Sequence, residues 1–160
     1  MVDFIKAVTE ALREQDKSTE DLFQNGVVSK NTFYKYKQRN PSIKTLVNIA
    51  NYLEVSLDCL LEFSDENNFV PYEDDQSGFY DNLIAMIKKS NLTSRQFCAE
   101  MNYSRANIDR YKNGVLPNLQ TLIEIAQYFG CGVDDLLVHQ WEFFVVVNKI
   151  FEAANTLSWV

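Results

Sequence analysis

The chain contains an internal repeat, and this repeat limits the possible folds more than any other feature of the sequence. Residues 4–38 align without a gap on residues 79–113, and residues 41–61 align on residues 117–137. Matched positions in the two copies are Phe4 and Phe79, Leu12 and Ile87, Leu22 and Phe97, Ser29 and Ser104, Tyr36 and Tyr111, Pro41 and Pro117, Ile49 and Ile125, and Asp58 and Asp134. The sequence therefore predicts one structural unit that is used twice.

Each copy has the pattern of five helices, because apolar residues recur three and four positions apart. The expected helices are 4–15 and 79–90, 19–25 and 94–101, a third that spans 29–38 and 104–114, a fourth after Pro41 and Pro117, and 57–62 and 133–138. Gly114 suits the left-handed residue that ends a helix. The first copy has to turn at the same point with Gln38, Arg39 and Asn40, none of which is glycine.

The third helix of each copy is polar and basic on its outer side. Ile108 and Tyr111 are spaced to face a core in the second copy, as are Phe33 and Tyr36 in the first. The residues left to point outward are Arg105, Asn107, Arg110 and Lys112 in the second copy, and Lys30, Asn31, Lys35 and Lys37 in the first. Such a face either contacts a partner or is simply solvated.

The net charge of −7 is concentrated in one short segment. Residues 64–78 carry five acidic groups and no basic ones, whereas residues 1–63 have a net charge of −1 and residues 79–137 a net charge of 0. A nearly neutral unit can still bind a polyanion if its basic groups share one face. The overall negative charge therefore argues against nucleic acid as a partner but does not exclude it.

Several kinds of protein are disfavoured by what the sequence contains. No apolar run approaches the roughly 18 residues of a membrane span, and the N-terminus lacks the pattern of a signal peptide. Cys59, Cys98 and Cys131 are far apart and are expected to be buried, reduced thiols, and His139 is the sole histidine. We therefore expect a cytoplasmic protein with no metal site, no cofactor, no membrane contact and no enzymatic activity.

Two segments lie outside the repeats. Residues 64–78 have the composition of an acidic linker, which is either a solvated connector or docks on a neighbouring domain through Phe69, Val70 and Tyr72. Residues 139–160 form an amphipathic C-terminal segment, with a sixth helix expected at 140–156. This segment either packs between the domains or forms a homodimer contact. The predicted domains are thus 1–63 and 79–138.

The second copy resembles the phage-repressor (Cro/C1, or XRE) helix-turn-helix family. The resemblance is carried by Leu92-Thr93 at the entry to the second helix, Ser104 before the third, Asn113-Gly114 after it, Pro117 before the fourth, and the ending Val133-Asp134-Asp135-Leu136-Leu137. It covers residues 79–138 well and residues 4–62 more loosely. The resemblance implies an all-α fold of two tandem five-helix lambda-repressor-like domains plus a C-terminal helix.

The same resemblance implies double-stranded DNA as the partner, with the third helix in the major groove. Base edges would be read by Arg105, Ala106 and Arg110 in the second copy and by Lys30, Asn31 and Lys35 in the first. Phosphates would be held at the start of the second helix and the end of the third. The residues implied there are Thr93, Ser94 and Asn113 in the second copy, and Ser18, Thr19 and Gln38 in the first, with Lys37, Arg39 and Lys112 adding non-specific attraction.

The first copy departs further from the family pattern. Its turn between the second and third helices has Val27 where the second copy has Asn102, so the adjacent Gly26 is expected to take the left-handed conformation. Glu20 and Asp21 place negative charge where a phosphate would approach. The leading hypothesis is a sequence-specific DNA-binding transcriptional regulator, a repressor. Of the two copies, the second is the better supported as a DNA-binding unit. The alternative is a protein-binding module on the same fold that antagonises another regulator.

Overall fold

The computed structural model describes residues 3–73, 78–138, 150 and 152–154, and these residues form helices and no strand. The helices are α1 (Phe4–Glu14), α2 (Thr19–Gln24), α3 (Lys30–Lys35), α4 (Ile43–Leu53), α5 (Leu57–Leu60), α6 (Gly78–Lys89), α7 (Ser94–Met101), α8 (Arg105–Lys112), α9 (Leu119–Phe129) and α10 (Asp134–Leu137). The expected helix at 140–156 lies outside the described residues except for positions 150 and 152–154, which are helical.

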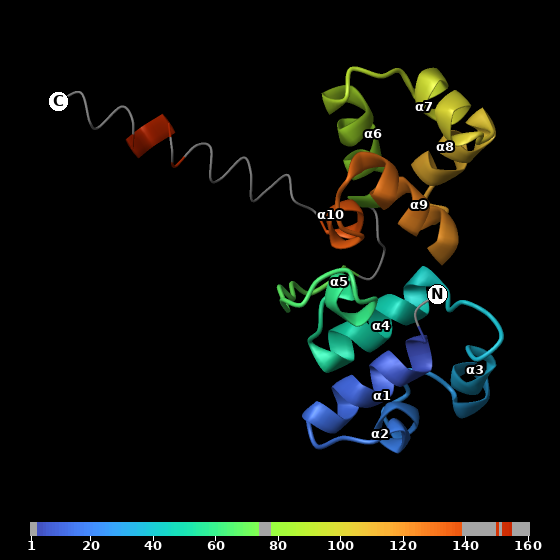
Figure 1. The fold of residues 1–160 in the computed structure, drawn as a ribbon, viewed down its shortest axis with the longest axis vertical. Coiled ribbons are helices and arrows are strands. Elements are labelled where there is room, and N and C mark those ends of the chain that lie inside the picture. Colours follow the sequence, from blue (N-terminus) through green and yellow to red (C-terminus); the bar gives the residue numbers. More distant parts are fainter. Residues whose placement is uncertain (1–2, 74–77, 139–149, 151, 155–160) are drawn as a thin grey trace.

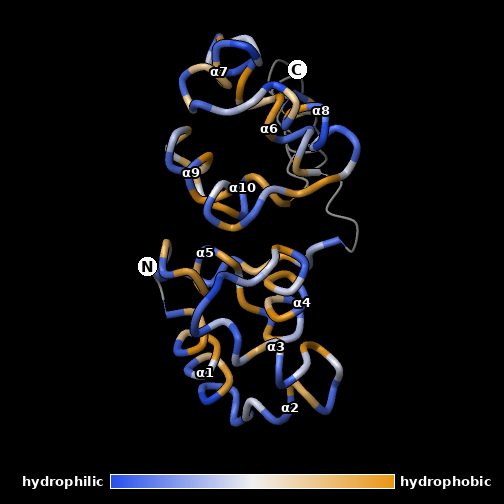
Figure 2. Tube along the Cα trace, turned by 90° about the vertical axis from the view of Figure 1, so that its right-hand side faces the viewer, coloured by the Kyte–Doolittle hydropathy of each residue, from blue (hydrophilic) through white to orange (hydrophobic). Residues whose placement is uncertain are grey.

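The helices form two units, which we call the N-terminal unit (α1–α5) and the C-terminal unit (α6–α10). Figure 1 shows the two units stacked one above the other, with α5 and α10 at the junction between them. Helices α3 and α8 lie on the same side of the molecule (Figure 1), and this side faces the viewer in Figure 2. The arrangement therefore places the two basic helices on one side.

Each unit is built around an apolar core to which all of its helices contribute. Phe33, Leu46 and Ile49 are fully buried in the N-terminal unit, as are Phe97 and Leu122 in the C-terminal unit. Burial of such side chains stabilises a fold by about 1.5–3 kcal/mol each, so these positions fix the packing of the helices.

Both cores contain an aromatic pair at matching positions of the repeat. The rings of Phe4 and Tyr36 meet edge to face at 5.8 Å, and those of Phe79 and Tyr111 meet in the same way at 5.2 Å. The inward placing of Tyr36 and Tyr111 that the spacing predicted is thus confirmed, since Tyr111 is buried and Tyr36 packs half-buried against the core. Each pair ties the first helix of its unit to the basic helix or its end.

The segment between the units is docked on the N-terminal unit through Tyr72. This side chain is buried, whereas Val70 is exposed. The backbone N–H of Tyr72 donates to Asn51 Oδ1 at 2.9 Å, and Asn51 Nδ2 donates to the Tyr72 carbonyl at 3.2 Å. Of the two interpretations of this segment, docking holds for Tyr72. Residues 74–77 lie outside the described part.

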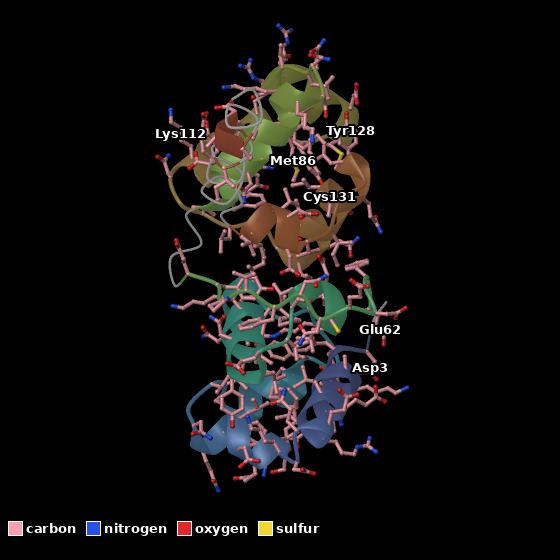
Figure 3. The ribbon with its side chains drawn as sticks, turned by 90° about the vertical axis from the view of Figure 1, so that its left-hand side faces the viewer. Asp3, Glu62, Met86, Lys112, Tyr128 and Cys131 are labelled. Carbon is pink, nitrogen blue, oxygen red and sulfur yellow. The ribbon has the colours of Figure 1, made fainter. Side chains whose placement is uncertain are left out.

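The cysteines are less buried than expected. Cys98 is buried, but Cys59 and Cys131 are half-buried, and all three are free thiols. Burial raises the pKa of the Cys131 thiol to about 11, so this group stays protonated near neutral pH. Its sulfur lies 3.8 Å from Met86 Sδ on α6. Both side chains are labelled in Figure 3. Within the described residues, no helix is both long and apolar enough to cross a bilayer.

Candidate nucleic-acid interface

The start of α7 is built from neutral polar groups. Thr93 Oγ1 accepts from the backbone N–H of Gln96 at 3.1 Å, and Gln96 Oε1 accepts from the N–H of Thr93 at 2.8 Å. This reciprocal capping box satisfies two amides that a helix start leaves unpaired. Thr93 is exposed and Ser94 is half-buried. The positive end of the α7 dipole therefore faces solvent beside Arg95 without a carboxylate in its first turn.

The turn from α7 to α8 depends on one left-handed residue. Asn102 ends α7 with φ 56° and ψ 39°, a conformation that asparagine tolerates better than most residues. Ser104 then begins α8, and its Oγ accepts from the N–H of Ala106 at 3.3 Å. The turn fixes the angle at which α8 leaves α7, and this angle determines which side chains of α8 project from the surface.

Helix α8 has one packed side and one outer side. Tyr111 is buried and Ile108 is half-buried, as the spacing predicted. Of the residues predicted to point outward, Arg105, Arg110 and Lys112 are exposed and Asn107 is half-buried. Ala106 and Asn113, which the family resemblance implied, are also exposed. Lys112 lies at the outer edge of the C-terminal unit (Figure 3). The structure thus brings Arg105, Arg110 and Lys112 to one exposed helix that carries a single carboxylate, Asp109.

The start of α2 is acidic where the start of α7 is neutral. Asp21 Oδ2 accepts from the backbone N–H of Ser18 at 2.7 Å, so a carboxylate occupies the place that Gln96 has in α7. Glu20 adds a second negative charge to the same turn. Because a helix N-terminus attracts anions through its free amides and dipole, a carboxylate already bound there weakens the attraction for a phosphate.

The turn from α2 to α3 takes its left-handed residue one position earlier than the turn from α7 to α8. Gly26 has φ 67°, and Val27 N–H donates to the Leu22 carbonyl at 3.0 Å. The predicted shift of the turn to Gly26 is therefore confirmed. It leaves Ser29 free to begin α3, with its Oγ accepting from Thr32 N–H at 3.2 Å.

Helix α3 is shorter than predicted and ends at Lys35 instead of continuing towards Gln38. The N–H groups of Tyr36, Lys37 and Gln38 donate to carbonyls three residues back, which is the tight pattern of a 3₁₀ turn. In α8, by contrast, Gly114 at φ 89° lets Val115 N–H reach the Arg110 carbonyl at 3.0 Å. Lys37 therefore lies in a turn, while Lys30, Asn31 and Lys35 are exposed on α3.

A groove of about 760 Å³ separates the two units near α3. It is lined by Thr32, Tyr36, Arg39, Asn40, Pro41, Ser42, Ile43, Lys44 and Thr45 from the N-terminal unit, and by Leu116, Pro117, Asn118, Leu119 and Gln120 from the C-terminal unit. Arg39 and Lys44 are its charged residues, and no carboxylate lines it. Sequence reasoning did not identify Lys44, because its place in the groove depends on how the two units pack together.

Comparison with known proteins identifies one of the two units. Residues 82–142 match the family model of the Cro/C1-type HTH DNA-binding domain. The match begins within α6 and includes α7, α8, α9 and α10. No curated protein and no solved structure matches the chain. The Cro/C1-type domain thus contains Thr93, Ser94, Arg105 and Arg110, and its presence supports a DNA-binding regulator.

Proposed function

We propose that this protein is a sequence-specific transcriptional repressor that binds double-stranded DNA in the cytoplasm and reads the major groove with α8. The observation that carries the proposal is the match of residues 82–142 to a DNA-binding domain, combined with the exposure of Arg105 and Arg110 on α8. An α-helix fits the major groove of B-form DNA, and arginine can donate two hydrogen bonds to one guanine.

The contacts to the DNA backbone would come from residues on both sides of α8. The neutral start of α7, with Thr93 and Ser94, offers amides and hydroxyls to one phosphate. Lys112 and Asn113 at the end of α8 are exposed and can reach a second phosphate. These contacts carry no sequence information, and they would hold the register in which Arg105, Ala106, Asn107 and Arg110 meet the bases.

The proposal extends to the N-terminal unit as a second helix-turn-helix domain. Its helices follow the same order, and the Phe4–Tyr36 pair repeats as Phe79–Tyr111. Helix α3 would present Lys30, Asn31 and Lys35 to a second half-site, with Lys37 in the turn beyond it. Since α3 and α8 lie on one side of the molecule (Figures 1 and 2), one chain can address two half-sites.

The groove between the units would lie over the DNA between the two half-sites. Arg39 and Lys44 would meet the phosphates there, because they are the charged residues among the polar and apolar groups that line the groove, and no carboxylate lines it. A basic groove of this kind also explains how a chain with a net charge of −7 can bind a polyanion. The proposed function includes a homodimer contact through the C-terminal segment, most of which lies outside the described residues.

Selection from random duplex DNA at two salt concentrations tests the proposed function. The full chain is compared with Arg105→Ala/Arg110→Ala and with Lys30→Ala/Lys35→Ala, which removes the same charge from α3. We expect the full chain to enrich one bipartite motif and the α8 variant to lose one half of it, with a loss of roughly 10- to 100-fold in affinity. The absence of enrichment and of binding at low salt would contradict the proposal.

A second candidate function is favoured by one observation in the N-terminal unit. Tyr34 on α3 is 42% exposed, packs against Phe23 and Phe33, and lies beneath the Lys37 ammonium group. Exposed tyrosine beside apolar side chains is typical of protein interfaces. In this alternative, the N-terminal unit binds another regulator while α8 binds DNA. The selection experiment separates the two, because only a DNA-binding α3 changes the motif when Lys30 and Lys35 are removed.

A further inference from the structure

The junction between the units is held by aspartates at matching positions of the repeat. Asp58 Oδ1 accepts from the backbone N–H of Val133 at 2.7 Å, at the start of α10. In the opposite direction, Asp134 Oδ2 accepts from the backbone N–H of Asp58 at 2.9 Å, at the start of α5. Each unit therefore supplies a carboxylate to a helix start in the other unit.

Tyr72 joins this arrangement to the body of the N-terminal unit. Its hydroxyl donates to Asp134 Oδ1 and accepts from the backbone N–H of Leu57 at 2.8 Å. The backbone of Tyr72 is held by two hydrogen bonds to Asn51, and its ring packs against Phe69 at 6.1 Å. Burial, followed by the charge of Asp134, raises the pKa of the Tyr72 hydroxyl, so it remains a hydrogen-bond donor near neutral pH.

The repeats differ at the residue before α5 and α10, and this difference makes room for the Asp58 carboxylate at the start of α10. Ser56 precedes α5 and caps it, with Oγ accepting from Cys59 N–H at 3.2 Å. The matching position before α10 is Gly132, which has no side chain to offer. A Cβ at Gly132 would lie 2.2 Å from Asp58 Oδ2. The glycine therefore opens the space that the Asp58 carboxylate of the other unit fills.

We propose that Asp58, Tyr72, Gly132 and Asp134, which we name the interunit clamp, hold the two units in one arrangement, so that the protein binds two DNA half-sites at a single separation. Hydrogen bonds in both directions across the junction restrict both rotation and translation. The clamp thus makes the half-site spacing a property of the protein. This inference rests on the proposed DNA-binding function, and it assigns Asp58, Tyr72 and Asp134 as positioning residues.

A flexible pair of domains would behave differently on DNA. Five extra base pairs turn the second half-site to the opposite side of the duplex, and ten bring it back to the same side about 34 Å further along. Domains joined by a flexible linker can still reach the more distant site. Units held by the clamp cannot, because the distance between α3 and α8 is fixed. Recovery of affinity at ten extra base pairs therefore distinguishes the two cases.

The experiment measures affinity for the selected bipartite motif with zero, five and ten base pairs inserted between its halves. For the wild type we expect the affinity to fall by about 10-fold or more with five inserted base pairs and also with ten. Gly132→Ala displaces the Asp58 carboxylate without changing any charge. In this variant the loss of affinity with ten inserted base pairs should be about threefold or less. Tyr72→Phe should act in the same direction, since it removes the hydroxyl that bridges Leu57 and Asp134.

One further variant serves as a control. Tyr128→Phe removes a tyrosine–carboxylate hydrogen bond, to Glu100, within the C-terminal unit and should keep the wild-type spacing profile. A folded Gly132→Ala variant with the wild-type spacing profile would overturn the proposal.

A measurement without DNA separates failure of the clamp from failure of the proposed function. Spin labels are attached through non-cysteine handles at the exposed positions 35 on α3 and 110 on α8. We expect one narrow distance distribution for the wild type and a broader one for Gly132→Ala. A broad wild-type distribution would disprove the clamp even if DNA binds. A narrow one in a protein that selects no DNA motif would disprove the DNA function while leaving the clamp intact.

Discussion

The segments α2–α3 and α7–α8 have the same order of elements but differ in the charge that they present. The first turn of α2 carries Glu20 and Asp21, whereas the first turn of α7 has no acidic residue. In both helices a capping box pairs amides that the helix start would leave unpaired. The side chain that completes it is the carboxylate of Asp21 in α2 and the neutral amide of Gln96 in α7. Of these two ways of capping a helix, the neutral one leaves the helix start able to attract an anion, and the carboxylate weakens that attraction.

The two basic helices also differ in how they are anchored. Phe33 on α3 is fully buried, and its ring meets those of Phe23 and Tyr34. The matching position on α8 is Ile108, which is half-buried. Both units also have an aromatic contact near the C-terminal end of the basic helix, Tyr36 with Phe4 and Tyr111 with Phe79. Helix α3 thus has a fully buried ring at its centre in addition to this contact, whereas the centre of α8 has only a half-buried isoleucine.

The largest effect that we expect from this difference is on stability. Phe33→Ala removes a fully buried ring and should lower the free energy of unfolding by about 3–5 kcal/mol. Ile108→Ala removes a half-buried side chain and should cost about 1–2 kcal/mol. Urea unfolding followed by circular dichroism measures both. Equal losses for the two variants would show that α3 and α8 are anchored alike.

Much of the local structure follows from single residues, which is why it was predictable. The alternation of inward and outward positions on α8 follows from the spacing of Ile108 and Tyr111, and Gly26 took the left-handed conformation because Val27 is β-branched. The early end of α3 was not predicted, because the 3₁₀ turn at Tyr36 competes with a helix that the side-chain pattern alone would continue.

The junction between the units could not be predicted in the same way. The repeat itself shows that Asp58 matches Asp134, but each aspartate alone resembles an ordinary first-turn carboxylate of a short helix. Their contact depends on how α5 and α10 are placed relative to one another, and local sequence patterns contain no information on that placement. Lys44 was missed for the same reason, because its role depends on the groove that the two units form together.

Exchange of the two helix starts tests whether their charge decides DNA binding. Glu20→Arg/Asp21→Gln gives α2 the residues of α7, and Arg95→Glu/Gln96→Asp makes the reverse change. At low salt, we expect the first variant to bind a non-specific duplex about 10-fold more tightly, because fewer carboxylates oppose the phosphates. The reverse variant should bind about 10-fold more weakly.

Titration of binding against salt concentration measures these changes and adds a second test. The slope of log K against log salt should become steeper for the first variant and shallower for the second. Glu10→Arg/Glu14→Gln makes the same change in net charge at exposed positions on α1 instead of α2. If this control has the same effect as the exchange at α2, then net charge, and not the charge of the helix start, governs binding.

The smallest expected effect concerns the starts of α5 and α10, where the two units differ at Ser56 and Gly132. Burial, the charge of Asp134 and a hydrogen bond to Asp134 raise the pKa of Asp58 from 3.8 to about 6. Other titratable groups near Asp58 are Glu66, Tyr72, Asp135 and the Cys131 thiol. A raised pKa means that the folded protein holds this proton more tightly than the unfolded chain does, so the contribution is complete below about pH 4 and is lost as the pH rises through 6.

We therefore expect the wild type to lose stability between pH 4 and pH 7 relative to Asp58→Asn, which imitates the protonated carboxyl at every pH. Because solvent screens a partly exposed group, the loss should be about 1 kcal/mol instead of the full value that the shift would imply. Thermal unfolding of both proteins at pH 4, 5, 6 and 7 measures the difference. A difference that stays constant over this range would show that the pKa of Asp58 is the same in the folded protein and in the unfolded chain. The Asp58 carboxylate would then be ionised over most of this range and would repel Asp134 across the junction. The clamp would in that case depend on its backbone N–H donors and Tyr72 alone, and Tyr72→Phe would become the variant with the larger effect on spacing.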